Sequence, residues 1–98
     1  MSDDRLLDAR NRAVRAQALV DDPLLKEGFD ALEAAYIATW RATRPEDQNA
    51  REKLYLAVNV IGKLREHLQS VIANGRIADA ELHALTQEQE RRKRFGII

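Results

Sequence analysis

The chain has 98 residues and a mass of 11.2 kDa, and its 16 basic and 16 acidic side chains give a formal net charge of +0. It is 45% hydrophobic and 33% charged, with few glycines (4), few prolines (2) and no cysteine. The lack of cysteine excludes disulfide scaffolds, cysteine-based zinc sites, iron–sulfur clusters and thiol catalysis. The scarcity of turn residues disfavours an all-β domain, and the zero net charge disfavours nucleic-acid binding through overall charge.

The sequence predicts neither a membrane-spanning segment nor an N-terminal signal peptide. The chain has no apolar run long enough to span a bilayer. Its N-terminus carries Asp3 and Asp4 in place of the basic residues that begin a signal peptide. We therefore expect no membrane partner and a location in the cytosol.

Residues 1–20 are predicted to form the first helix. Their apolar positions are thinly spaced and mostly alanine, so this helix needs a partner to stay ordered. The apolar positions are Leu6, Leu7, Ala9, Ala13, Val14, Ala16 and Leu19.

A second helix is predicted to begin at Pro23, directly after two aspartates, and to run to about Thr43. Proline is favoured at the first helical position, and aspartate is a strong N-cap. Gly28, in the middle of this helix, is a candidate for a close helix crossing. One helix face is apolar at spacings of three and four residues: Leu25, Phe29, Leu32, Tyr36 and Trp40.

A third helix is predicted from a capping box formed by Thr43 and Glu46 to about Ala73. It ends at Asn74-Gly75, a typical C-cap pair. A heptad-like seam runs along it, which either a coiled coil or a packed helical hairpin explains. The seam residues are Leu54, Ala57, Ile61, Leu64, Leu68 and Val71.

These segments predict an all-α fold in a single domain, residues 1–98. Residues 23–73 form a central antiparallel helical hairpin, flanked by two shorter helices at residues 1–20 and 76–94, with an apolar tail at residues 95–98. The core of such a small chain is thin, which predicts a homo-oligomer. The residues expected in the hairpin core or a subunit interface are Leu25, Phe29, Leu32, Tyr36, Trp40, Leu54, Ile61, Leu64, Leu68 and Val71.

The sequence offers no catalytic, metal-binding or cofactor-binding constellation. It lacks phosphate-binding glycine motifs and nucleophile motifs, and His67 and His83 lack metal-ligand spacing. We therefore expect a protein that is not an enzyme and takes no cofactor. Residues 71–85 have the outline of a helix-turn-helix but lack a row of base-reading side chains.

Two features near the C-terminus are candidate binding elements. Four consecutive cations, Arg91, Arg92, Lys93 and Arg94, are candidate phosphate contacts. The alternatives are a solvated helix end, where cations suit the helix dipole, and a protein docking site. The apolar residues that follow are expected to pack against a neighbouring subunit or enter a partner's groove. They are Phe95, Ile97 and Ile98.

Four stretches together resemble small all-helical proteins of tailed phages, prophages and gene transfer agents. They read DDPLLKEGFDALEAAYIATWRAT (residues 21–43), REKLYLAV (51–58), HLQSVIANGRIADAEL (67–82) and RRKRFGII (91–98). Some proteins of this size and build are small terminase subunits, and others belong to the head-assembly genes. The chain differs from the usual small terminase because it lacks an evident N-terminal helix-turn-helix.

The resemblance implies a non-enzymatic DNA-packaging protein, located in the cytoplasm of the bacterial host or in the virion. Such a protein forms a homo-oligomer and contacts double-stranded DNA non-specifically, the large terminase subunit or other phage head proteins. In this function residues 23–73 supply the ring core, and residues 91–94 are the candidate DNA contacts. The alternatives are a structural virion or head-assembly protein that binds only protein, and a small cytosolic adaptor unrelated to phages.

Overall fold

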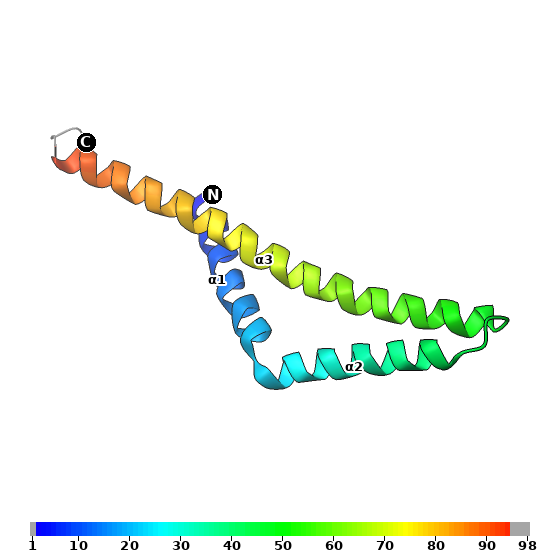
Figure 1. Cartoon of the computed structure of the whole chain (residues 1–98). Helices are drawn as coiled ribbons and strands as arrows, with labels where there is room; N and C mark the ends of the chain where they lie inside the picture. Colours follow the sequence, from blue (N-terminus) through cyan, green and yellow to red (C-terminus); the bar gives the residue numbers. More distant parts are fainter. Residues whose placement is uncertain (1, 95–98) are drawn as a thin grey trace. The chain divides into compact units, whose positions relative to one another are not determined.

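The computed structural model describes residues 2–94, and within them it contains three α-helices and no β-strand (Figure 1). Helix α1 is Ser2–Asp21, α2 is Pro23–Ala42 and α3 is Gln48–Arg94. The predicted all-α fold class is confirmed. The predicted apolar tail lies outside the described residues.

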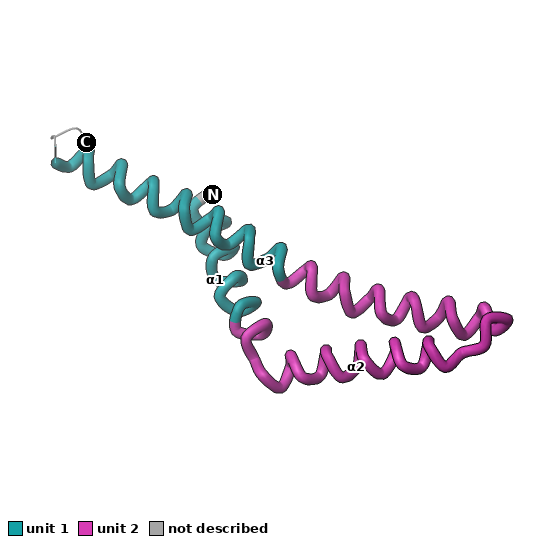
Figure 2. The backbone as a smooth tube through the Cα atoms, viewed as in Figure 1, with its two compact units in different colours: residues 1–17, 69–98 teal, residues 18–68 magenta. Residues whose placement is uncertain are grey.

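The helices are divided between two compact units (Figure 2). Unit 1 combines α1 up to Gln17 with α3 from Gln69 onward, and unit 2 is Ala18–Leu68. Helices α1 and α3 therefore each contribute to both units, whereas α2 belongs wholly to unit 2.

The predicted start of α2 is confirmed in atomic detail. The Asp22 carboxylate accepts hydrogen bonds from the backbone N–H groups of Leu24 (2.9 Å) and Leu25 (3.1 Å). Pro23 occupies the first helical position, where its missing N–H leaves no unsatisfied donor. Asp22 has extended backbone dihedral angles (φ −67°, ψ 116°), which end α1 and begin α2.

The predicted capping box of Thr43 and Glu46 is wrong. Thr43 instead ends α2, because its N–H (3.1 Å) and its hydroxyl (2.6 Å) both donate to the carbonyl oxygen of Trp40. Helix α3 begins later, at Gln48. There the carboxylate of Asp47 accepts a hydrogen bond from the N–H of Ala50 (3.3 Å).

The predicted helix end at Asn74-Gly75 is also wrong, because α3 continues through both residues as one helix of 47 residues. The separate fourth helix at residues 76–94 is therefore the second part of α3. Gly75 is buried in unit 1, where a Cβ atom would overlap the Cβ of Ala13 and lie 3.0 Å from the carbonyl oxygen of Ala9. Close packing against α1, not a helix end, explains this glycine.

Unit 1 has a small core of residues from both helices. Leu6 and Ala16 of α1 are buried, as are Ile72 and Ala78 of α3. Only the leucine and the isoleucine among these side chains are large, so the burial of this core contributes only a few kcal/mol. An ion pair of 3.7 Å between Arg10 and Asp79 joins the two helices at the surface.

Unit 2 is packed more loosely than unit 1. Ile61 is its one buried hydrophobic residue among those described, and none of the 20 residues of α2 is buried.

Arg65 makes several of the contacts between α2 and α3 in unit 2. Its guanidinium donates to Asp30 (2.8 Å) and Glu33 (3.1 Å), and its central carbon lies 5.4 Å from the ring centre of Phe29. Arg51 has a similar place nearer the start of α3. It lies 4.6 Å from the ring centre of Trp40 and donates to the hydroxyl of Thr43 (2.8 Å).

Candidate functional site

The four cations of the predicted DNA contact are exposed in the last turn of α3. Successive helical residues are rotated by about 100°, so four in a row surround the helix end instead of forming a stripe. Arg92 also donates to Glu88, one turn earlier, at 3.1 Å. This arrangement suits point contacts with phosphates and does not form a base-reading row. The charged groups are Arg91, Arg92, Lys93 and Arg94.

The predicted docking residues Phe95, Ile97 and Ile98 lie outside the described residues.

The predicted apolar face of α2 is only partly covered. Leu25, Phe29 and Tyr36 are half-buried, whereas Leu32 (45%) and Trp40 (40%) stay exposed. The spacing correctly placed these residues on α2. The face does not form a buried core within the chain.

The predicted seam of α3 is displaced at one position. Ile61 is buried, and Leu54, Leu68 and Val71 are half-buried, but Leu64 is 46% exposed. Half-buried Arg65 takes the next position and contacts α2. A search for apolar residues does not identify Arg65, because its guanidinium is charged. Its position nevertheless fits the spacing of three and four residues along the seam.

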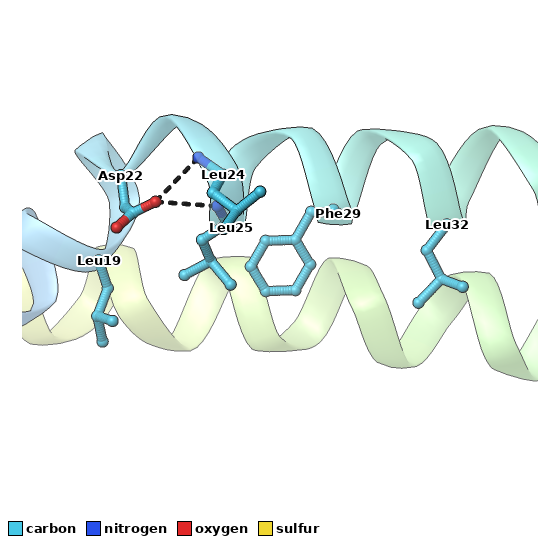
Figure 3. A pocket seen from close by; sticks show the side chains of 7 residues that line it. Leu19, Asp22, Leu24, Leu25, Phe29 and Leu32 are labelled. Carbon is cyan, nitrogen blue, oxygen red and sulfur yellow. Dashed lines mark hydrogen bonds between the residues drawn. The ribbon is translucent and has the colours of Figure 1, made fainter.

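A leucine-lined hollow of about 520 Å³ lies on unit 2, at the start of α2 (Figure 3). Its wall is almost entirely apolar, and Asp22 at its edge is occupied in capping α2. The sequence analysis missed this surface because Leu24 lies off the predicted apolar face. The lining residues are Leu19, Asp22, Leu24, Leu25, Gly28, Phe29 and Leu32.

A smaller hollow of about 220 Å³ lies further along unit 2, between α2 and α3. Trp40 and Tyr55 contribute aromatic rings to it, and Tyr55 is 63% exposed. Both hollows are shallow apolar surfaces, which suit contact with another apolar surface better than chemistry on a small polar substrate.

The described residues hold no group of three or more His, Cys, Asp or Glu side chains that could bind a metal ion. Over the same part of the chain, no helix has the length and apolar character that crossing a bilayer requires.

Comparison of the chain with known protein families, curated proteins and solved structures found no match. The resemblance to phage proteins therefore stays a prediction.

Proposed function

We propose that the protein is a non-enzymatic assembly protein that self-associates and contacts DNA, in the manner of a small terminase subunit. One observation carries the self-association. The apolar face of α2 repeats over its whole length, yet none of its 20 residues is buried within the chain. Half-exposed leucine and aromatic side chains of this kind are stabilised when another protein surface covers them.

The assembling element in this proposal is the antiparallel helical hairpin of residues 23–73. Two contacts support it. Arg51, early in α3, lies on Trp40, late in α2, and Arg65, later in α3, lies on Phe29, early in α2. Residues early in one helix contact residues late in the other, which is the pattern that an antiparallel pair of helices produces.

Contact with DNA is assigned to the basic end of α3. Residues 91–94 present four exposed cations, and phosphate contacts of this kind are non-specific and salt-dependent. The proposed protein partners are the large terminase subunit or other phage head proteins, with Phe95, Ile97 and Ile98 as docking residues. The proposed location is the cytoplasm of the bacterial host or the virion.

The DNA contact is tested with the triple variant Arg91→Ala, Arg92→Ala, Lys93→Ala, in fluorescence anisotropy with a labelled duplex. Its matched control removes three exposed cations of α1: Arg5→Ala, Arg12→Ala, Arg15→Ala. We expect only the first variant to weaken binding, and to reduce the slope of log affinity against log salt by about 1 per lost contact. Equal losses in both variants, or none in the first, would contradict the assignment.

Self-association is tested by light scattering on a sizing column at moderate salt. A large assembly with one defined mass supports the packaging function, because heterologous contacts around one axis close into a ring with a fixed number of copies. A monomer at every concentration contradicts self-association altogether.

The second candidate is a structural virion or head-assembly protein that acts only through protein–protein contacts. The zero net charge and the apolar hollows of unit 2 favour it. A well-defined oligomer that shows no DNA affinity at low salt would select this function.

A further inference from the structure

The cations at the end of α3 follow a block of acidic and amide residues at a spacing of one helical turn. Residues 87–90 read QEQE and residues 91–94 read RRKR, so each cation stands four positions after one residue of the first block. Residues four apart are neighbours on a helix surface. Glutamates therefore precede Arg92 and Arg94 by one turn, whereas neutral glutamines precede the other two cations.

One of these neighbouring pairs is an ion pair. Arg92 donates to the Glu88 carboxylate at 3.1 Å, and the exposed fractions of the two side chains are 60% and 48%. Within residues 2–94, the other three cations of the cluster form no salt bridge. A glutamate placed four residues before an arginine is the more favourable order for such a pair, because it also suits the helix dipole.

The pair lies on a stretch of α3 that is exposed throughout. Every residue from 83 to 94 is exposed, so a bound partner can reach the guanidinium of Arg92 without any rearrangement of the helices. Carboxylate and phosphate groups both accept hydrogen bonds from the same planar fork of N–H donors. Phosphate must therefore displace Glu88 before it can use those donors.

We infer that Glu88 competes with DNA phosphate for Arg92 and so weakens the contact between this helix end and DNA. This inference rests on the proposed DNA contact and names a residue that regulates it. The cations without a carboxylate partner contact the duplex first, and Arg92 joins them only after it leaves Glu88. Glu88 is thus a positioning residue, which lowers the affinity for DNA through Arg92.

A double-mutant cycle on the full chain tests the competition. The variants are Glu88→Gln, Arg92→Gln and the two combined, and their affinities for a labelled duplex are measured by fluorescence anisotropy at low salt. Glutamine removes the charge and differs little from glutamate and arginine in helix propensity. The cycle therefore isolates the coupling between the two side chains.

Glu90→Gln is the matched control. It removes the same charge from the same helix end, but residues two apart do not face each other, so it does not release Arg92. Both glutamate variants reduce the general repulsion between carboxylates and phosphates. We expect Glu88→Gln to bind DNA about twofold more tightly than Glu90→Gln, the factor that corresponds to one exposed ion pair at this spacing.

The same comparison is then made in the Arg92→Gln background. There Glu88 has no arginine to hold, so we expect the Glu88→Gln and Glu90→Gln substitutions to change the affinity equally. A difference that appears with Arg92 and disappears without it supports the competition. Equal effects of the two glutamate variants in the parent chain overturn it, as does a difference that persists without Arg92.

The outcomes also separate this inference from the proposed function. A parent chain with no affinity for DNA at low salt overturns the proposed DNA contact, and the competition with it. A parent chain that binds DNA but shows no coupling between Glu88 and Arg92 overturns only the competition. Because salt screens an exposed ion pair, we also expect the difference between Glu88→Gln and Glu90→Gln to decrease as salt is added.

Discussion

Gly75 of α3 lies directly against Ala13 of α1, and its missing side chain is what allows the two helices of unit 1 to touch. A Cβ at position 75 would overlap the Cβ of Ala13 and lie 3.4 Å from its Cα. The obstacle includes backbone as well as side-chain atoms, so it cannot be removed by a rotamer change. The tight crossing leaves unit 1 intolerant of added volume at this point.

The first prediction is that Gly75→Ala destabilises the protein. Overpacking of this kind costs about 1–3 kcal/mol, which exceeds the gain of about 1 kcal/mol in helix propensity. Urea unfolding followed by circular dichroism, at one fixed protein concentration, measures the change. The control Gly62→Ala has open space and is expected to stabilise by about 0.4–1 kcal/mol. A Gly75→Ala variant as stable as its parent would show that α1 and α3 separate easily.

A second prediction concerns Arg65, which contacts Asp30, Glu33 and Phe29 together. We expect Arg65→Ala to lower the free energy of unfolding by about 1–2 kcal/mol, since exposed ion pairs and a cation–π contact each contribute less than about 1 kcal/mol. Arg65→Lys is expected to recover less than half of this loss, because an ammonium cannot donate in a fork to two carboxylates.

Salt dependence separates the contributions of Arg65. The difference in the free energy of unfolding between the parent chain and Arg65→Ala is expected to decrease at high salt, because salt screens the ion pairs. Arg10→Ala is the control, because its single pair with Asp79 is longer, at 3.7 Å, and it is expected to change stability by less than about 0.5 kcal/mol. Full recovery in Arg65→Lys would mean that only the net charge at this position matters.

The third prediction is that Asp22→Ala destabilises α2 by about 0.5–2 kcal/mol, the usual effect of losing an N-cap. Asp22→Asn is expected to retain most of the stability, because its amide oxygen can accept the same hydrogen bonds. Unfolding in urea compares the two variants. Equal losses in both would assign the effect to the negative charge near the helix N-terminus instead of to the hydrogen bonds.

A fourth prediction uses Trp40, the single tryptophan of the chain, as a reporter. Arg51 covers its ring at 4.6 Å, so Arg51→Ala is expected to increase quenching of the tryptophan fluorescence by acrylamide. Lys53→Ala, an exposed cation in the same turn of α3, is the control and is expected to have no effect. Unchanged quenching in Arg51→Ala would show that the guanidinium does not shield the ring in solution.

Local rules predicted the beginning of α2 and its apolar spacing because both depend on residues that are neighbours in the chain. Asp22 and Pro23 are sufficient to define that helix start. Helix α3 begins later than predicted. The hydroxyl of Thr43 donates to the carbonyl oxygen of Trp40 in α2, and the carboxylate of Asp47 caps α3 instead.

The remaining differences depend on tertiary contacts that no local pattern contains. Gly75 resembles a helix end in sequence, but its role is set by Ala13, which is 62 positions away. Arg65 takes a place in the seam because Phe29 and two carboxylates face it. Likewise, the hollow beside Gly28 depends on which side of α2 remains uncovered, and helical periodicity alone does not specify this side.

The lack of buried residues in α2 has a consequence for the lifetime of the protein. A helix that is only half covered opens at little free-energy cost, and proteases cut such segments in proportion to how often they open. A solitary copy is therefore expected to be cleaved first in α2. On the proposed self-association, a copy whose α2 is covered by a partner is expected to survive longer, and the quantity of intact chain is expected to follow the extent of assembly.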